Sequence, residues 1–428
     1  MAQDLLFHQG FYWGCATSSH QVEGNNTNNQ WWAWEQVGGH IGDGSVSGLA
    51  CDHYNRFEED FALARELGHN AHRLSIEWSR IEPEEGRWDR AEVDHYKRVM
   101  ESLHRHGLTP FVTRHHFTNP LWVERGGGWT NPRMIDRIAR YAGFMARELG
   151  DLVPFWLTIN EPMVVAGACY IAGAHPPGKQ DLAMGLQATR HLLLAHGRMY
   201  QAIKEAALHN PQAGPVLNMT DVQPASNSQE DRQTAALFDQ FWNEYFLAGI
   251  ETGTVGPPAG AGEEAPGVKR SWDLIGLNYY SRSLIRRGPP PTGIEQVPPP
   301  EGAEHSTMGW EVYPEGLHHC LLRLKRYGRP IYVTENGIAT GDDEQRCRYI
   351  MRHLQQAHRA IGEGADLRAY LHWTFTDNFE WAEGWTQKFG LIAMGPRQLP
   401  RQPRPSAYLF RDIARRNGVP GEMGERYG

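Results

Sequence analysis

The chain has 428 residues, of which 40% are hydrophobic and 21% are charged, a composition close to ordinary globular usage and far from disordered, collagenous or membrane proteins. Its formal net charge of −8 comes from 50 acidic and 42 basic side chains scattered along the chain, so no basic stripe could follow a phosphate backbone and nucleic acid is not expected as a partner. The first ten residues lack both a basic start and an apolar core, and no apolar run reaches the roughly 18 residues of a membrane helix, so we expect a soluble, cytoplasmic protein with no membrane partner.

Eight short apolar segments, rich in β-branched or aromatic residues, recur along the chain, and most precede a longer segment with helical periodicity. In chain order the predicted strands are Phe11–Ala16, Ala71–Trp78, Pro110–His116, Trp156–Asn160, Pro215–Met219, Leu274–Tyr280, Pro330–Thr334 and Ala369–Thr374. Alternating strands and helices imply parallel strands joined by right-handed crossovers, in an open sheet or a closed barrel. Eight units favour closure, so the prediction is an α/β fold with one (β/α)₈ barrel domain over residues 1–428 and extended βα loops.

Two of the segments between these strands carry clear helix signals. Asn131 and Pro132 suit an N-cap and a first-turn proline, and an apolar stripe follows until Gly150. A second stripe begins after Asp343 and ends at Gly362. Both segments are predicted to be helices that pack one face onto the sheet.

Two segments rich in proline and glycine interrupt the alternation, Thr252–Arg270 and Arg286–His305. No separate apolar core follows either of them, so we interpret both as long surface loops of the same domain.

Cysteine and histidine usage indicates neither disulfides nor bound metal. The five cysteines are far apart and never spaced as C-x-x-C, which predicts buried thiols. The 21 histidines include no H-E-x-x-H motif, so we predict no metal site and no cofactor. The 15 tryptophans suit both core packing and contacts with the C–H faces of sugar rings, and their number alone does not distinguish these uses.

Two of the predicted strands run into a glutamate. The fourth ends at Glu161, and the seventh ends at Glu335, which Asn336 and Gly337 follow. Each glutamate taken alone is typical of a solvated or helix-capping residue, and Asn-Gly is an ordinary turn signal. In a barrel of this kind, reactive groups lie where strands end. A pair of carboxyls there suits glycoside cleavage, because one protonates the leaving oxygen and the other meets the oxocarbenium-like carbon from the opposite face.

Four motifs give the chain a close resemblance to the family 1 glycoside hydrolases, the β-glucosidase family, along essentially its whole length. The family motif T-x-N-E-P, which carries the acid/base glutamate, is intact at Thr158–Pro162, and T-E-N-G, which carries the nucleophile, is intact at Thr334–Gly337. The N-terminal pattern Phe11–Gly24 and the late pattern Trp373–Trp381 match as well. The resemblance implies that Glu161 is the catalytic acid/base and Glu335 the nucleophile.

The resemblance also implies which residues bind the sugar. Hydrogen bonds to its hydroxyls would come from Gln21, His116, Asn160 and Glu380. Trp373 would form the floor under the sugar, Trp381 would add a contact, and Asn278 would line the wall beside the nucleophile. Taken singly, a histidine or tryptophan at these positions is more typical of core packing.

Two further residues are expected beside the nucleophile. By the same resemblance, Arg73 and Tyr280 would flank Glu335, and a nearby guanidinium lowers a carboxyl pKa and keeps the group ionised. Glu161 needs the opposite, a proton held by burial or by a negative neighbour such as Glu335.

The sequence departs from the family pattern at two positions. Phe117 follows His116 where the family commonly has tryptophan, which predicts a slightly wider sugar pocket. Met163 follows the N-E-P motif where tryptophan is frequent, so the leaving-group preference does not carry over from the family. Glu380 keeps to the pattern, and its negative charge would repel a 6-phosphate, although Lys388 lies downstream.

Together these features predict a retaining β-glycosidase acting by double displacement. The preferred interpretation is a β-glucosidase that removes terminal non-reducing β-D-glucosyl groups, with β-galactosyl and β-fucosyl groups also open, from a small-molecule β-glycoside or a short oligosaccharide. The alternatives are an enzyme that transfers the glycosyl unit to other acceptors, a non-catalytic sugar-binding relative and a 6-phospho-β-glycosidase. The sequence carries no prediction of oligomeric state.

Overall fold

The computed structural model describes residues 4–207, 209–395 and 398–427. The strands are β1 (Leu5–Leu6), β2 (Tyr12–Ala16), β3 (Ala71–Ser75), β4 (Thr109–His115), β5 (Phe155–Asn160), β6 (Gln212–Pro224), β7 (Thr254–Val255), β8 (Glu263–Glu264), β9 (Ile275–Arg287), β10 (Ile294–Val297), β11 (Ile331–Asn336), β12 (Leu367–Trp373), β13 (Ile392–Gly395), β14 (Gln398–Pro403) and β15 (Gly418–Val419).

The α-helices are α1 (Ser19–Val22), α2 (Gln30–Glu35), α3 (His53–Glu66), α4 (Trp78–Ile81), α5 (Arg90–Arg105), α6 (Leu121–Arg125), α7 (Arg133–Leu149), α8 (Pro162–Ala166), α9 (Leu182–Ala206), α10 (Gln229–Asp239), α11 (Tyr245–Thr252), α12 (Pro314–Lys325), α13 (Asp343–Gly362), α14 (Pro405–Arg416) and α15 (Gly421–Tyr427). Short 3₁₀ segments are η1 (Gly128–Thr130), η2 (Gly150–Leu152) and η5 (Trp381–Glu383), and π-helical segments are η3 (Gly167–Ile171) and η4 (Gln240–Glu244).

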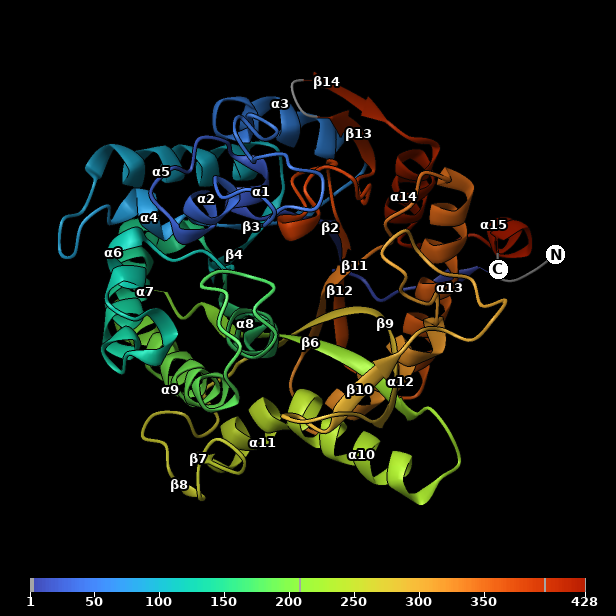
Figure 1. The fold of residues 1–428 in the computed structure, drawn as a ribbon. Helices are drawn as coiled ribbons and strands as arrows, with labels where there is room; N and C mark the ends of the chain where they lie inside the picture. The colour runs from blue at the N-terminus through green and yellow to red at the C-terminus, as the bar shows by residue number, and fades with distance from the viewer. Residues whose placement is uncertain (1–3, 208, 396–397, 428) are drawn as a thin grey trace.

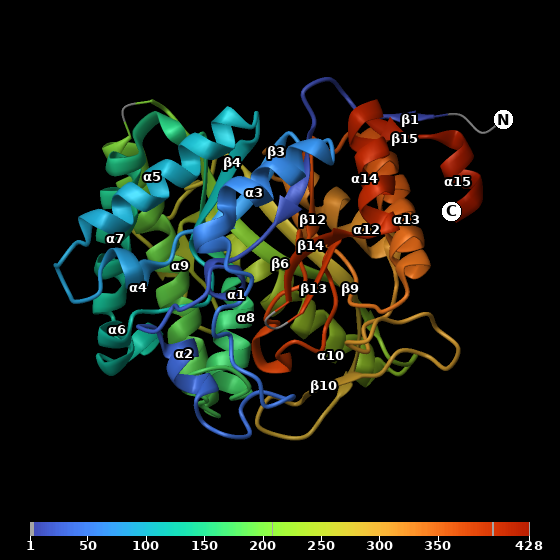
Figure 2. The same cartoon turned by 90° about the horizontal axis from the view of Figure 1, so that it is seen from above.

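The eight predicted strands form and close into a barrel. They pair in parallel in the order β2, β3, β4, β5, β6, β9, β11, β12, and β12 pairs back onto β2. Helices surround the strands on the outside, as Figure 1 shows and as Figure 2 shows from above. This is the predicted (β/α)₈ fold. Near the chain ends, β1 pairs with β15, so the two ends of the described chain lie together.

Both predicted helices begin and end where the sequence indicates. The Asn131 side chain accepts a hydrogen bond from the backbone N–H of Arg133, the first residue of α7, at 2.9 Å. Asp342 caps α13 by accepting from the N–H of Glu344 at 3.0 Å. Helix α7 stops at Leu149, because Gly150 turns to a φ of +46°.

Several boundaries differ from the prediction. Strand β3 ends at Ser75 and not at Trp78, because Trp78 begins the short helix α4. Strands β6 and β9 run on well past the predicted ends and stay paired as far as Pro224 and Ile285.

Neither predicted surface loop is a plain loop. The stretch Arg286–His305 holds β10, which pairs antiparallel with the end of β9. The stretch Thr252–Arg270 holds the β7–β8 pair, and its Val255 and Val268 are fully buried. The glycines and prolines mark turns within these segments, while the apolar residues between them join the core.

The barrel interior is apolar at one end and polar at the other. Early strand positions supply a packed apolar cluster: Ala71, Phe111, Phe155, Leu157, Val216, Leu274, Tyr332, Ala369 and Leu371. Phe111 and Phe155 stack with their ring centroids 4.4 Å apart. Later positions on the same strands carry buried polar side chains, among them Arg73, Asn160 and Asn278. The apolar end closes the barrel, so the open end at the strand C-termini is left for chemistry.

Two further sequence predictions concern thiols and membranes. All five cysteines are buried and free, as predicted. Within the described residues, no helix combines the length and apolar character needed to cross a bilayer.

Candidate active site

A cavity of about 440 Å³ opens where the barrel strands end. Eight of the eleven predicted site residues line it, namely His116, Asn160, Glu161, Tyr280, Glu335, Trp373, Glu380 and Trp381. The other three, Gln21, Arg73 and Asn278, are fully buried behind the lining and hydrogen-bond to its carboxyl groups. The structure therefore brings together every side chain that the motifs single out.

Glu335 lies near the end of β11 and has a donor on each carboxyl oxygen. Arg73 donates from Nη1 to Oε1 at 2.5 Å, and the Tyr280 hydroxyl donates to Oε2 at 2.6 Å. Burial raises the pKa of Glu335 above its usual value, and the Arg73 cation and the Tyr280 hydrogen bond oppose that rise. From the sequence, only the opposing effects of Arg73 and Tyr280 are expected. In the structure burial is the larger cause, because the carboxyl is removed from water.

Glu161 directly follows β5 and has a strained backbone conformation. Its φ of +48° lies in the left-handed region, which residues with a Cβ rarely adopt and which is common at functional sites. Asn278 and Asn218 both donate to its Oε1, at 2.7 Å and 3.2 Å. Because two amide donors occupy Oε1, the carboxyl proton belongs on Oε2. No hydrogen bond from the described residues reaches Oε2.

The two glutamates have opposite electrostatic surroundings. Burial raises the pKa of Glu161 to about 8, and the charge of Glu335 acts in the same direction. At Glu335 the second cause is Arg73, which acts against burial. Of the two carboxyls, Glu335 is therefore the one that loses its proton first, and Glu161 is the one that keeps it at neutral pH.

A hydrogen-bond network behind the cavity couples both glutamates. The Asn160 side-chain oxygen accepts from Arg73 at 2.6 Å and from Asn278 at 3.1 Å. Thr334 in turn donates to the Asn278 side-chain oxygen at 2.7 Å. These contacts fix the Arg73 guanidinium toward Glu335 and the Asn278 amide toward Glu161, because each donor has one satisfied orientation.

A third carboxyl, that of Glu380, also lines the cavity. Gln21 donates to its Oε2 at 3.1 Å and to Asn378 at 3.1 Å. Burial and the charge of Glu335 raise the pKa of Glu380 to about 8, so it is largely protonated at neutral pH and not the fixed anion that the sequence argument assumed. The charge repulsion of a 6-phosphate stays a prediction, and the raised pKa of Glu380 weakens it at neutral pH. A carboxylic acid there can both donate to and accept from neutral hydroxyls.

Aromatic rings line the same cavity. The His116 ring lies nearly parallel to Trp373 and to Trp381, with centroids 6.0 Å away in both cases and interplanar angles of 21° and 19°. Phe117 packs against Trp381 at 5.1 Å. Flat rings beside a carboxyl and an amide form the type of surface that binds the C–H faces and hydroxyls of a sugar.

Comparison with known proteins decides the family. The profile of glycosyl hydrolase family 1 matches residues 3–419. The chain is 34% identical to β-glucosidase A of Thermotoga maritima over 96% of this chain and 98% of that protein. It is 31% identical to a β-galactosidase of Pyrococcus woesei over 98% of this chain and 99% of that protein.

The fold agrees. A β-glycosidase structure from Pyrococcus horikoshii superposes with a TM-score of 0.93 and 38% identity, covering 100% of this chain and 99% of that chain. The chain belongs to glycosyl hydrolase family 1. The resemblance indicated by the four sequence motifs is thereby confirmed over nearly the whole chain, and the chain is a glycoside hydrolase of the β-glycosidase type.

Sequence reasoning missed some residues of this family 1 site. Asn218 of β6 donates a hydrogen bond to Glu161. It lies near the C-terminal end of a predicted strand, and this position is the sequence feature that could have identified it as a site residue. Phe238, Trp242, Met308 and Trp310 also line the cavity, but they come from segments outside the predicted strands.

From the sequence, Met163 is expected to bear on leaving-group preference, but its side chain is not among the residues that line the cavity. Met163 is buried, and among the described residues its neighbour Val164 lines the cavity instead. The short helix α8, which begins directly after Glu161, turns Met163 into the core. A tryptophan replaced by methionine here therefore alters packing under the site and not the cavity wall itself.

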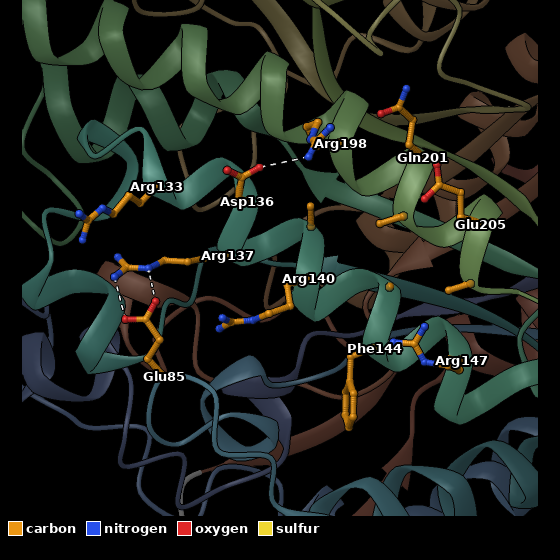
Figure 3. A pocket seen from close by; sticks show the side chains of 14 residues that line it. Glu85, Arg133, Asp136, Arg137, Arg140, Phe144, Arg147, Arg198, Gln201 and Glu205 are labelled. Carbon is orange, nitrogen blue, oxygen red and sulfur yellow. Dashed lines mark hydrogen bonds and ion pairs between the residues drawn. The ribbon is translucent and has the colours of Figure 1, made fainter.

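A larger hollow, of about 940 Å³, lies outside the barrel between α7 and α9. Figure 3 shows its charged side chains spread along the two helices, with Arg137 paired to Glu85 and Arg198 to Asp136. They do not converge on one point. Nor do three or more metal-ligating side chains gather anywhere in the described part of the chain. The chemistry of a family 1 enzyme therefore belongs to the barrel cavity.

Proposed function

We propose that this family 1 enzyme is a retaining β-glucosidase, with Glu335 as the nucleophile and Glu161 as the acid/base. The observation that carries the proposal is the contrast between two glutamates in one cavity. Glu335 is held by a cation and a phenol, whereas Glu161 is held by two neutral amides and faces the charge of Glu335. One carboxyl is thus suited to attack and the other to carry a proton.

In the first step the Glu335 carboxylate attacks the anomeric carbon while Glu161 passes its Oε2 proton to the departing oxygen. The bond from the anomeric carbon to the leaving oxygen breaks, and an ester to Glu335 forms. The Oε1 atom of Glu161 keeps its two amide donors throughout, so the proton on Oε2 moves without reorganisation of the carboxyl group.

The second step uses a change in the electrostatics of Glu161. The charge of Glu335 helps to hold the pKa of Glu161 at about 8, and esterification removes that charge. Glu161 then carries a lower pKa and, as a carboxylate, takes a proton from the water that cleaves the ester. Two displacements at one carbon retain the β configuration.

The preference for glucose rests on the sugar end of the cavity and on the relatives. Gln21 and Glu380 are hydrogen-bonded to each other and together offer donors and acceptors to neutral hydroxyls. One similar protein is named a β-glucosidase and another a β-galactosidase, so we place glucosyl groups first and galactosyl or fucosyl groups second. We propose that the whole chain is one catalytic domain that acts on small β-glycosides or short oligosaccharides.

The roles of the two glutamates can be tested with the matched variants Glu335→Ala and Glu161→Ala. On 4-nitrophenyl β-glucoside, Glu335→Ala should lose at least about a thousandfold in kcat. Added azide should restore turnover of an activated aryl β-glucoside by both variants, and NMR of the products identifies the anomer.

The product anomers should differ between the two variants. Azide entering from the face of the missing Glu335 gives an α-glucosyl azide, whereas azide attacking the ester in the Glu161 variant gives a β-glucosyl azide. The same anomer from both variants would refute the assignment, and wild-type activity in Glu335→Ala would refute the mechanism.

A further inference from the structure

The cavity continues beyond Glu161, on the side away from the sugar pocket. Gln21, Glu380 and Trp373 come from segments around β2 and β12, and they hold the sugar in the proposed function. The leaving group must begin at Glu161, which protonates it, and Glu161 directly follows β5. Strand β5 lies between β4 and β6. The residues that follow β4, His116 and Phe117, pack against Trp373 and Trp381 of the sugar pocket, so the leaving group extends toward β6 and the helices packed on it.

An apolar wall stands at that side of the cavity. Its lining residues are Val164, Met219, Phe238 and Trp242. Phe238 and Trp242 stack with centroids 5.6 Å apart and an interplanar angle of 19°. They lie on α10 and on the π-helical segment η4 that continues it, beside the long β6 and β9 strands (Figure 1).

The Trp242 ring lies against a second π-helical segment. Gly167 begins η3, just after α8, and a Cβ built on it would lie 3.6 Å from the Trp242 ring. The indole therefore rests on backbone that follows Glu161 by six residues in the chain. Single π-helical turns are frequent at functional sites. Here one such turn holds the ring and another forms the surface under it.

Thr220, Ser283 and Arg282 along this wall already have partners, whereas the indole N–H of Trp242 is buried without one among the described residues. Thr220 donates to the carbonyl of Ser281 at 2.9 Å and pairs with Ser283 at 3.0 Å. Arg282 donates to both carboxyl oxygens of Glu311, at 2.7 Å and 2.8 Å. At the rim, Gln296 is exposed. A sugar leaving group would need free donors and acceptors for several hydroxyls, whereas a flat apolar group needs only ring surface.

Resting on the proposed function, we propose that Trp242, stacked on Phe238, determines leaving-group specificity, and that the enzyme prefers β-glucosides with an aromatic leaving group over those with a sugar. The indole offers a half-buried face next to the acid Glu161, and burying apolar area there contributes to transition-state binding as well as to substrate binding.

The test compares three substrates that share the glucosyl group. These are benzyl β-glucoside and cellobiose, which both release an alcohol, and β-glucosyl fluoride, which releases a single atom that cannot reach the wall. Wild type should show a higher kcat/KM on benzyl β-glucoside than on cellobiose. Trp242→Ala should lose roughly ten- to fiftyfold in kcat/KM on the benzyl substrate, little on cellobiose, and less than about twofold on the fluoride.

Two further variants separate specificity from folding. Trp242→Phe keeps a ring and should retain most of the benzyl preference. Trp88→Ala removes another half-buried indole, one stacked on Phe144 and not among the cavity-lining residues, and should leave the substrate ratios unchanged. Equal losses on all three substrates in Trp242→Ala, or a wild type that prefers cellobiose, would overturn the inference. Failure of wild type to cleave the fluoride would instead count against the proposed function.

Discussion

At the scale of single residues, the site depends on Glu161 and Glu335 having different neighbours while sharing one cavity. Burial acts on both carboxyls in the same direction. The Arg73 cation then lowers the pKa of Glu335, whereas the Glu335 anion raises the pKa of Glu161. Because the anion beside Glu161 exists only until the ester forms, its pKa follows the reaction.

These pKa shifts predict a bell-shaped pH profile of kcat/KM for wild type. The alkaline limb should lie near pH 8, because loss of the proton from Glu161 removes the acid. The acid limb should lie above the usual range of glutamate, because the pKa of Glu335 is raised and its protonation removes the nucleophile. Initial rates on 4-nitrophenyl β-glucoside between pH 4 and pH 10 measure both limbs.

A control shows whether Glu161 or Glu380 sets the alkaline limb, because the pKa of Glu380 is also raised to about 8. On a dinitrophenyl β-glucoside, whose leaving group needs no proton, Glu161→Ala should lose the alkaline limb of kcat/KM. If the limb persists at the same pH in that variant, Glu380 and not Glu161 sets it.

The residues that could be predicted from the sequence are those with a fixed place in a short motif. Glu161 and Glu335 end strands whose apolar pattern is visible, and the barrel fold brings strand ends together. The place of Trp242 in the cavity wall could not be predicted, because the direction of its side chain depends on a π-helical turn. The protonation of Glu380 could not be predicted either, because it depends on burial beside another carboxyl that is distant in sequence.

At the scale of the elements, the contact between β11 and β12 explains the glycine of the T-E-N-G motif. A Cβ on Gly337 would lie 1.8 Å from the carbonyl oxygen of Trp373, a backbone atom that cannot move away alone. Glycine lets the end of β11, with Glu335, approach the end of β12, with Trp373. The motif residue thus sets the distance between the nucleophile and the floor of the sugar pocket.

Gly337→Ala should therefore destabilise the protein by about 3 kcal/mol and disturb the site. Urea unfolding and kcat/KM measure the two effects. Gly341→Ala is the matched control, because no atom lies within 4 Å of a Cβ built there. Equal stability of the two variants would show that the β11–β12 contact is not as tight as described.

Elements were predictable where local pattern and tertiary environment agree. All eight barrel strands carry β-branched or aromatic runs, and all eight form. The extensions of β6 and β9 escaped prediction because their outer halves contain charged and polar residues, such as Asp221 and Arg286, and are stabilised by pairing with each other and with β10. Such pairing is a property of the assembled barrel mouth.

At the scale of the whole molecule, the core contains several histidines that burial keeps neutral. Five are fully buried and have pKa values lowered to about 3 by burial: His69, His72, His196, His353 and His372. In the unfolded chain each takes a proton near pH 6.5. Their contribution to stability is therefore complete above that pH and is lost as the pH falls toward about 3.

The urea midpoint should accordingly fall steeply between pH 6.5 and pH 4. At pH 5 each such histidine costs up to about 2 kcal/mol. Carboxyls with raised pKa values, including Glu161, Glu335 and Glu380, act in the opposite sense, because they favour the folded state as the pH falls toward about 4.5. The histidines with lowered pKa values are more numerous. His69→Phe, at a site packed against Phe375 and Phe410, should reduce the proton uptake on unfolding by about one. Replacing the exposed His305 with glutamine should not. A flat midpoint over this range would contradict the account.

The most direct test of the central claim is to trap the ester on Glu335. A 2-deoxy-2-fluoro-β-glucoside with a dinitrophenyl leaving group should form the glycosyl-enzyme and release it slowly, because the fluorine disfavours the oxocarbenium-like transition state of both steps. Intact mass followed by peptide mapping should find one fluoroglucosyl group per chain, attached to Glu335. Attachment to Glu161, or turnover with no adduct and an inverted first-formed product, would contradict the account.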